Sequence, residues 1–168
     1  MSDLKPFDAN LAKLGSSNTQ EAFAAIQALK NQGIQILPAL IEQLRVSDMS
    51  VRTMIVVVLG EMGEAAAESS SQVATLMLED FEQLRMASAL TLTRIGSSSI
   101  PHLLRILASN DNTACFWAAW SMSFLDPSQI SDKALEILRN KRNQPDSPIE
   151  VFAAEEAIGK IVGNRLQQ

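Results

Sequence analysis

Only one cysteine and one histidine occur among the 168 residues of this chain, and tyrosine is absent. A lone cysteine, Cys115, cannot form an internal disulfide. The sequence also contains no Cys-x-x-Cys pair, no glycine-rich phosphate loop and no nucleophile elbow. Its pattern favours a surface or packing role for His102, and an unreactive position at the edge of the core for Cys115. We therefore predict no catalytic residue, no metal site and no cofactor.

Basic residues are also in deficit. The 14 Lys and Arg residues are outnumbered by 19 Asp and Glu residues, which gives a net charge of -5 and a pI near 4.9. Such a chain has no positive surplus with which to neutralise phosphates, so nucleic acid is disfavoured as a partner. No window approaches the roughly 18 uninterrupted apolar residues of a membrane helix, and the first residues do not form a signal peptide. These absences predict a cytoplasmic protein with no membrane insertion.

What the chain does contain is one pattern written five times. Gly33 and Gly63 end two matching stretches, and Gly96, Asp126 and Gly163 end three more at a spacing of roughly 30 residues. Each copy divides into two amphipathic stretches of about 10 to 12 residues, which are too short to be stable alone and must stack. The predicted repeats are about 4–33, 34–63, 64–96, 97–127 and 128–163 of a single domain, 1–168.

Capping and turn residues predict where the helices begin and end. Prolines suit the first turn of a helix, and glycines tolerate the left-handed conformation of a helix stop. The predicted opening prolines are Pro38 and Pro101, and the predicted N-caps are Asn18, Asp48 or Ser50, and Asp111. The third copy has no proline in its first helix, within 65–79, where Ser69–Ser71 could mark the start. The prolines in 141–148 predict an exposed loop.

Charged residues also recur in register. Arg52 and Arg85 share one repeat position, and Asp48 and Asp111 share the cap position. We expect a ladder of caps and ion pairs that holds adjacent repeats in register.

The run Pro38-Ala39-Leu40 to Leu44, followed by Asp48, Val51-Arg52 and Leu59 to Gly63, resembles the short HEAT-like repeat of the phycobilin lyase group and of many bacterial scaffold proteins. The resemblance extends from about Leu4 to Gly163. It implies an all-α fold, a right-handed α-solenoid of about five HEAT-like helix pairs whose second helices line a concave surface. Because the matched positions serve packing, capping and turns, the resemblance specifies no activity. Polar first and last helices are typical of a complete small array.

Apolar residues also occupy the helix face that stacking does not require. Counting from Glu21, Val51, Leu84, Ala114 or Glu150 as the first position of each second helix, positions 1, 5, 8, 9 and 12 are predicted core. Positions 3 and 7 fall on the opposite face. The predicted partner-binding residues there are Phe23, Val57, Met86, Leu90, Phe116, Trp120 and Phe152. Aromatic residues and methionine are enriched at protein interfaces.

Two interpretations of this face remain open. Curvature can half-bury individual side chains between repeats, and such an inter-repeat role is favoured for Trp117, at position 4. Alternatively, the apolar residues line a trough on the order of 40 to 50 Å long that holds a helix or an extended segment. Acidic residues near the repeat turns give one rim a negative charge, which leaves room for a basic partner.

We therefore expect a non-enzymatic scaffold or adaptor that binds a segment of another protein in a concave apolar groove. The alternative, which the resemblance implies, is a phycobilin lyase-like subunit that handles a linear tetrapyrrole, a bilin chromophore, on phycobiliproteins. A homodimer that closes its own groove is a third hypothesis.

Overall fold

The computed structural model describes residues 4–167, and every regular element among them is helical. The α-helices are α1 (Leu4–Leu14), α2 (Thr19–Asn31), α3 (Leu37–Val46), α4 (Met49–Met62), α5 (Ser70–Leu76), α6 (Glu82–Ile95), α7 (Ile100–Leu107), α8 (Asn112–Leu125), α9 (Asp132–Asn143) and α10 (Pro148–Arg165). Short 3₁₀ turns precede α3, α5, α7 and α9: η1 (Gly33–Ile36), η2 (Gly63–Ser69), η3 (Ser97–Ser99) and η4 (Pro127–Gln129). The prediction of an all-α fold is confirmed.

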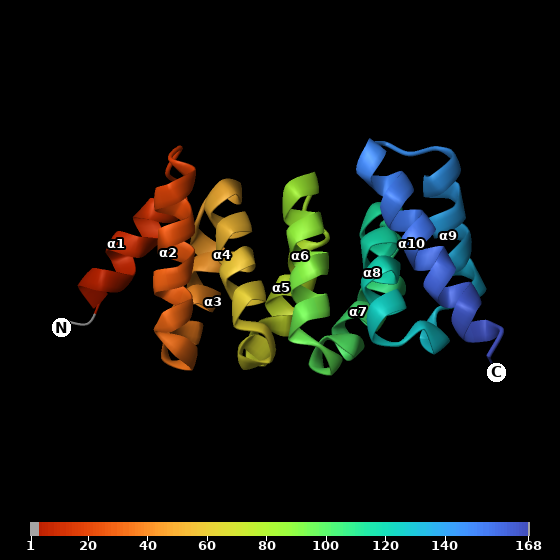
Figure 1. Ribbon diagram of the computed structural model, residues 1–168, viewed down its shortest axis with the longest axis horizontal. Coiled ribbons are helices and arrows are strands. Elements are labelled where there is room, and N and C mark those ends of the chain that lie inside the picture. Colours follow the sequence, from red (N-terminus) through yellow and green to blue (C-terminus); the bar gives the residue numbers. More distant parts are fainter. Residues whose placement is uncertain (1–3, 168) are drawn as a thin grey trace.

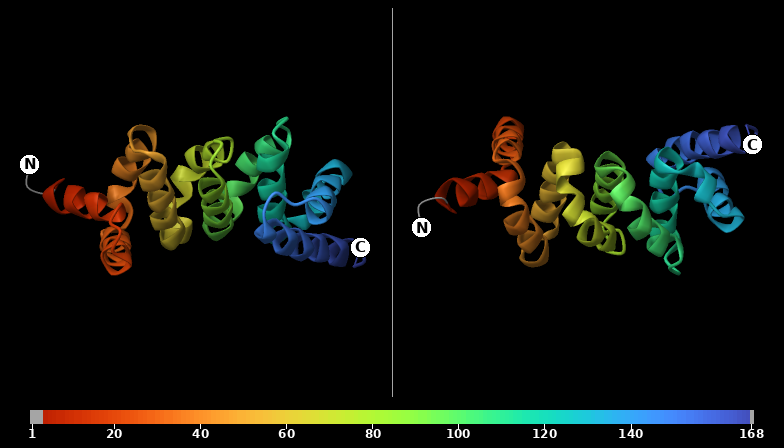
Figure 2. Two further views of the ribbon diagram at one scale, coloured as in Figure 1. Left: turned by 90° about the horizontal axis from the view of Figure 1, so that it is seen from above. Right: turned by 90° about the horizontal axis from the view of Figure 1, so that it is seen from below.

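The helices form a row of five successive pairs, each odd-numbered helix packing against the even-numbered helix that follows it. The even-numbered helices α2, α4, α6, α8 and α10 follow one another along one side of the row (Figure 1). The row is curved, because α2 at one end and α10 at the other project beyond the middle helices on the same side (Figure 2). The concave side of the molecule is therefore formed by the even-numbered helices.

Side chains cap the helices where the sequence predicts. Asn18 accepts hydrogen bonds from the backbone of Gln20 and Glu21, and Asp48 and Asp111 each accept one from the third residue beyond them, at 2.9 Å. Asp48 therefore caps α4 and Ser50 does not. Positive φ angles at Gly33, Gly63 and Gly96 (72°, 59° and 93°) turn the chain into the next 3₁₀ segment, a conformation that side chains with a Cβ disfavour.

The two stretches predicted to be irregular differ from one another. In the third pair, the chain after α4 first forms η2, and α5 begins at Ser70 and runs for only 7 residues. The predicted exposed loop over 141–148 is shorter than expected, since α9 continues to Asn143 and α10 begins at Pro148. The reason is the half-buried ammonium group of Lys141, which is held on the last turn of α9 by Asp146 and Glu150.

The middle helices approach closely because small and hydroxylated residues lie between them. A Cβ built on Gly60 of α4 would stand 2.6 Å from the Thr91 hydroxyl of α6. That hydroxyl donates a hydrogen bond to the Val56 carbonyl of α4 at 2.8 Å, and Ser121 of α8 makes the equivalent bond to Ala89 of α6 at 2.9 Å. Thr91 and Ser121 both occupy position 8 of their helices, so one contact is repeated along the row.

The charged ladder between repeats is also present. Buried Arg85 donates from Nε to the Met77 carbonyl and pairs with Asp80 and, at 3.3 Å, with the capping residue Asp111 of the fourth pair. Arg52, at the same repeat position, donates to the Arg45 carbonyl and lies 3.9 Å from Glu79 of the third pair. Each arginine thus connects its own pair to the next one. None of the helices between residues 4 and 167 combines the length and the apolar character needed to cross a membrane.

Candidate binding pocket

A pocket of about 650 Å³ opens on the concave side, between α6, α8 and α10. Its lining residues are Val57, Gln83, Met86, Ala87, Leu90, Trp117, Trp120, Ile149, Phe152, Ala153 and Glu156. Leu90, Ile149 and Phe152 leave 45%, 43% and 69% of their surfaces exposed to solvent. Exposed apolar side chains around a pocket of this size are typical of a binding surface.

The walls of the pocket repeat one helical pattern. Gln83, Met86, Ala87 and Leu90 line it from α6, and Ile149, Phe152, Ala153 and Glu156 line it from α10. Both sets follow the spacing i, i+3, i+4, i+7, which places side chains on one face of a helix. Trp117 and Trp120 of α8, three residues apart, lie between these walls in the helix order, and Val57 of α4 extends the lining beyond α6.

Trp120 connects α8 to α10 across the pocket. Its indole N–H donates a hydrogen bond to Glu156 Oε2 at 3.2 Å. Its ring meets the Trp117 ring at a centroid distance of 6.2 Å and an angle of 74°, and it packs against Phe124 at 4.9 Å. Edge-to-face contacts of this kind stabilise ring orientation beyond simple burial. The aromatic surface of α8 is therefore held in a defined position against α10.

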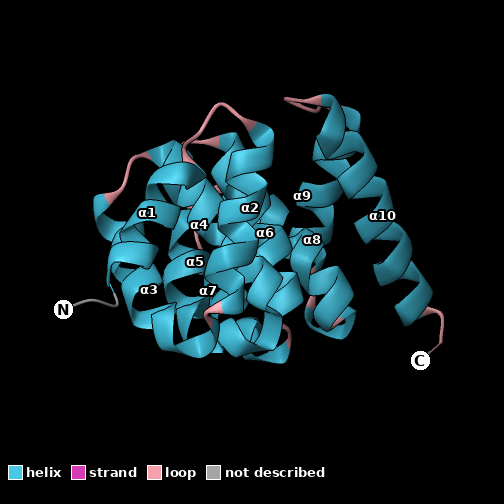
Figure 3. Ribbon diagram, turned by 60° about the vertical axis from the view of Figure 1, so that its left-hand side comes forward, coloured by secondary structure: helices cyan, strands magenta, loops and turns pink. Residues whose placement is uncertain are grey.

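The pocket continues into a smaller hollow at the start of α6 and α10, which adds Glu82, Ser147 and Pro148 to the lining. Here the Ser147 hydroxyl donates a hydrogen bond to Glu82 Oε1 at 2.7 Å. This bond joins residues 65 positions apart in the chain and fixes the beginning of α10 to the beginning of α6. The α9–α10 pair forms the end of the row at this side of the pocket (Figure 3).

A buried ion pair holds the connection that leads into α10. Glu150 is almost fully buried, accepts a hydrogen bond from the Asp146 backbone at 2.7 Å, and lies 3.1 Å from the Lys141 ammonium group. Burial acts to lower the pKa of Lys141, but hydrogen bonds and charges from Asp146 and Glu150 outweigh it and raise that pKa. This cluster joins the end of α9 to the start of α10, which forms one wall of the pocket.

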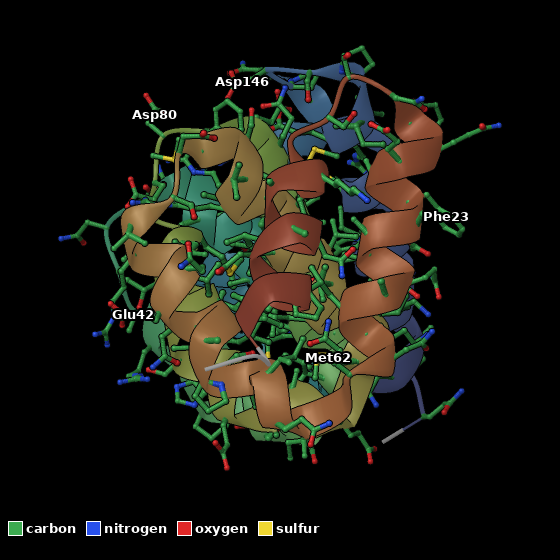
Figure 4. The ribbon with its side chains drawn as sticks, turned by 90° about the vertical axis from the view of Figure 1, so that its left-hand side faces the viewer. Phe23, Glu42, Met62, Asp80 and Asp146 are labelled. Carbon is green, nitrogen blue, oxygen red and sulfur yellow. The ribbon has the colours of Figure 1, made fainter. Side chains whose placement is uncertain are left out.

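Five of the seven residues predicted for the groove line the pocket together: Val57, Met86, Leu90, Trp120 and Phe152. Phe23 does not belong to it. Phe23 leaves 61% of its surface exposed, but it points outward from α2, at the far end of the row (Figure 4). The role of these residues in partner binding stays a prediction.

Phe116 does not face the groove, and that expectation is wrong. Its side chain has no exposed surface and packs in the hydrophobic core, with its ring 5.0 Å from that of Trp117. The assignment of faces from helical periodicity fails here because α8 is buried along most of its length between α6, α7, α9 and α10. Position 3 of α8 is therefore a core position, although the equivalent residues Met86 and Phe152 line the pocket.

The pocket residues that the prediction missed share a simple signal. Ala87, Trp117 and Ala153 occupy position 4, Glu156 occupies position 7, and Gln83 and Ile149 precede the first position of their helices. These residues share a face with positions 3 and 7, so the complete stripe i, i+3, i+4, i+7 would have identified them. Trp117 combines both interpretations considered for it: it is 3% exposed and core-packed, and it also lines the pocket.

No group of three or more potential metal ligands occurs in the described part of the chain. Cys115 is buried, and its thiol donates to the Ile106 carbonyl at 3.3 Å. His102 lies outside the pocket, where partial burial and neighbouring Arg105 lower its pKa. Glu156 is the one ionisable residue in the main lining, and Glu82 joins it in the hollow.

Fold and pocket together define an all-α protein of stacked helix pairs with an apolar pocket on its concave side. Over 158 aligned residues the chain is 34% identical to the uncharacterized protein SkfG of Bacillus subtilis (strain 168), and the alignment covers 94% of this chain and 92% of that protein. The chain therefore belongs to the same protein family as SkfG. No protein-family model matches the sequence.

Proposed function

We propose that this protein is a non-enzymatic adaptor, built as a right-handed HEAT-like α-solenoid, that binds an apolar segment of another protein in the pocket between α6, α8 and α10. One observation carries the proposal: exposed Leu90, Ile149 and Phe152 surround a pocket of about 650 Å³ that contains two tryptophans. Tryptophan is among the residues most enriched at the hot spots that dominate the binding energy of protein interfaces. Burial of such surfaces is worth about 25 cal/mol per Å² before the costs of association.

A linear tetrapyrrole fits this pocket less well than an apolar protein segment. Its propionate groups require cationic partners, whereas Glu156 is the ionisable residue of the main lining and the adjoining hollow contributes Glu82. No Lys or Arg lines either space. The charge of the lining thus favours the adaptor over the phycobilin lyase-like alternative.

Two phenylalanines provide a matched test. Phe152 lies in the pocket and Phe23 outside it, yet both occupy position 3 of their helices and are 69% and 61% exposed. The full-length protein and its Phe152→Ser and Phe23→Ser variants are used to capture proteins from native lysate, and captured proteins are identified and purified. Binding of the purified partner is then measured by calorimetry. We expect Phe152→Ser to weaken binding by at least about tenfold, as at an interface hot spot, and Phe23→Ser by less than about twofold.

Equal affinities of the two variants for the purified partner would refute the proposal that the pocket is the binding surface. Light scattering on the free protein tests the homodimer. If the wild type is a dimer and Phe152→Ser is a monomer, the occupant of the pocket is a second copy, and the adaptor proposal is overturned.

A further inference from the structure

Resting on the proposed function, we infer that the occupant of the pocket is a positively charged amphipathic α-helix, which lies between α6 and α10 and over α8. The inference depends on three properties of the pocket: the scarcity of polar partners in its lining, the spacing of the residues along each wall and the sign of its charge.

The lining favours an occupant whose backbone is already hydrogen-bonded. Besides the two indole N–H groups, Gln83 and Glu156 are the polar side chains of the main lining. Glu156 already accepts the Trp120 N–H, and the Trp117 N–H is buried without a partner among the described residues. An extended segment would bring several backbone N–H and C=O groups against apolar side chains, at about 1 to 3 kcal/mol for each group left unpaired. A helix satisfies these groups internally and presents side chains alone.

The length and residue spacing of the walls also suit a helical occupant. The stripes Gln83 to Leu90 and Ile149 to Glu156 each cover about two helical turns, which corresponds to roughly 10 Å. An apolar face with the spacing i, i+3, i+4, i+7 has the same length and period as each wall, as in other helix-in-groove complexes. A pocket of about 650 Å³ lies within the range of cavities that enclose drug-sized molecules and has room for more than one large side chain.

The charge around the pocket favours basic residues beside the apolar face of that helix. Exposed Glu82 lies at the start of α6, and exposed Glu156 lies two turns along α10. Two cations of the same helices have other contacts. Lys160 of α10 lies over the Phe124 ring at 4.4 Å, and Arg94 of α6 is paired with Glu61. With a net charge of -5 on the whole chain, lysine or arginine beside the apolar face of the occupant complements both carboxylates.

Three fluorescein-labelled synthetic peptides test the inference against the full-length protein. The first is an 18-residue leucine–lysine peptide with leucines at i, i+3, i+4 and i+7. The second has the same sequence with two central lysines replaced by proline, which breaks the helix. The third has glutamate in place of every lysine. Fluorescence anisotropy at low and high salt gives the affinities, and circular dichroism reports the helix formed on binding.

We expect the leucine–lysine peptide to bind as a helix, with an affinity that falls with salt, the proline peptide to bind at least about tenfold more weakly, and the glutamate peptide not to bind. Phe152→Ser should weaken the first complex by about tenfold, because the side chain belongs to the pocket. The double variant Glu82→Gln with Glu156→Gln should weaken it by about three- to tenfold. Glu64→Gln with Glu68→Gln removes two exposed carboxylates from η2, away from the pocket, and should weaken it by less than about twofold.

Equal binding of the helical and proline peptides would overturn the helix, and equal effects of the two glutamine pairs would overturn the charge complementarity. If the leucine–lysine peptide fails to bind, or binds Phe152→Ser as well as wild type, the inference is wrong. The adaptor function would then still stand if a purified protein partner loses affinity with Phe152→Ser and not with Phe23→Ser, so the two failures are distinguishable.

Discussion

The middle of the molecule and its C-terminal end use the same repeat positions for opposite purposes. Between α4, α6 and α8, Gly60, Thr91 and Ser121 allow close approach, and two hydroxyls bond directly to the carbonyls of the preceding helix. Between α8 and α10, the residue equivalent to Thr91 and Ser121 is Ala157, which has no hydroxyl. The hydrogen bond between these two helices runs from the Trp120 indole to Glu156 instead.

The difference shows how an array of helix pairs can leave an apolar pocket open on one side. Small and hydroxylated residues at every position would close each helix onto its neighbour, and the protein would have a continuous packed face. Two tryptophans on α8 line the pocket instead, and polar bonds at Glu150, Ser147 and Glu156 join α10 to its neighbours. The pocket lies beside the helix pair in which the hydroxyl-to-carbonyl bond is not repeated.

The largest effect is expected from disturbing the packed region at Gly60. Gly60→Val should lower the free energy of unfolding by about 3 kcal/mol, because its side chain meets Thr91 at a distance that neither residue can relieve without moving α4 from α6. Urea denaturation followed by circular dichroism measures the change. The matched control is Gly159→Ala on α10, at the same repeat position, where a Cβ meets nothing within 4 Å. This control should be neutral or stabilising by up to about 1 kcal/mol.

The next largest effect is expected at the buried ion pair between α9 and the start of α10. Lys141→Met should destabilise the protein by about 2 to 3 kcal/mol, since it leaves the buried Glu150 carboxylate without its cation. Lys133→Met, an exposed lysine of the same helix, should change stability by less than about 0.5 kcal/mol. Equal destabilisation by the two variants would show that α10 does not depend on the ion pair.

The same ion pair predicts a pH dependence. The folded-state pKa of Lys141 is raised above its ordinary value of 10.5, so its stabilising contribution is fully present below that pH and is lost as pH rises through the folded-state pKa. The difference in unfolding free energy between wild type and Lys141→Met should therefore shrink above about pH 10.5. A constant difference across that range would contradict the assigned interaction.

A smaller effect is expected from one hydroxyl of the packed region. Thr91→Val removes the bond to the Val56 carbonyl with little change of shape and should cost about 1 kcal/mol. Thr75→Val removes an exposed hydroxyl that bonds within its own helix and should cost less than about 0.5 kcal/mol. Thermal melting of both variants beside wild type distinguishes the two contributions.

The smallest effect on stability is expected in the pocket itself. Phe152→Ser should leave the unfolding free energy within about 0.5 kcal/mol of wild type, because most of the side chain is exposed in the free protein. Urea denaturation is again the measurement. A loss of more than about 1 kcal/mol would mean that Phe152 supports the fold. It would contradict the distinction between the packed middle helices and the pocket at the C-terminal end.

Helical periodicity predicted much of the pocket lining, but it failed at two residues for different reasons. Met86, Leu90, Trp120 and Phe152 were found because an apolar residue on the face opposite the core needs an explanation in any helix. Phe116 was misassigned because the periodicity argument assumes that every second helix has one free face, and α8 has almost none. Phe23 is exposed as expected, but proximity to the pocket depends on which helices are neighbours.

Local chemistry is enough to determine the elements of this protein. Asparagine and aspartate caps, glycines with positive φ and the apolar periodicity act over a few residues, so their consequences can be derived from the sequence alone. The burial of Phe116 and the pairing of Glu150 with Lys141 result from packing between helices. Only the tertiary structure could decide these features, because each depends on the volume and direction of side chains from several helices at once.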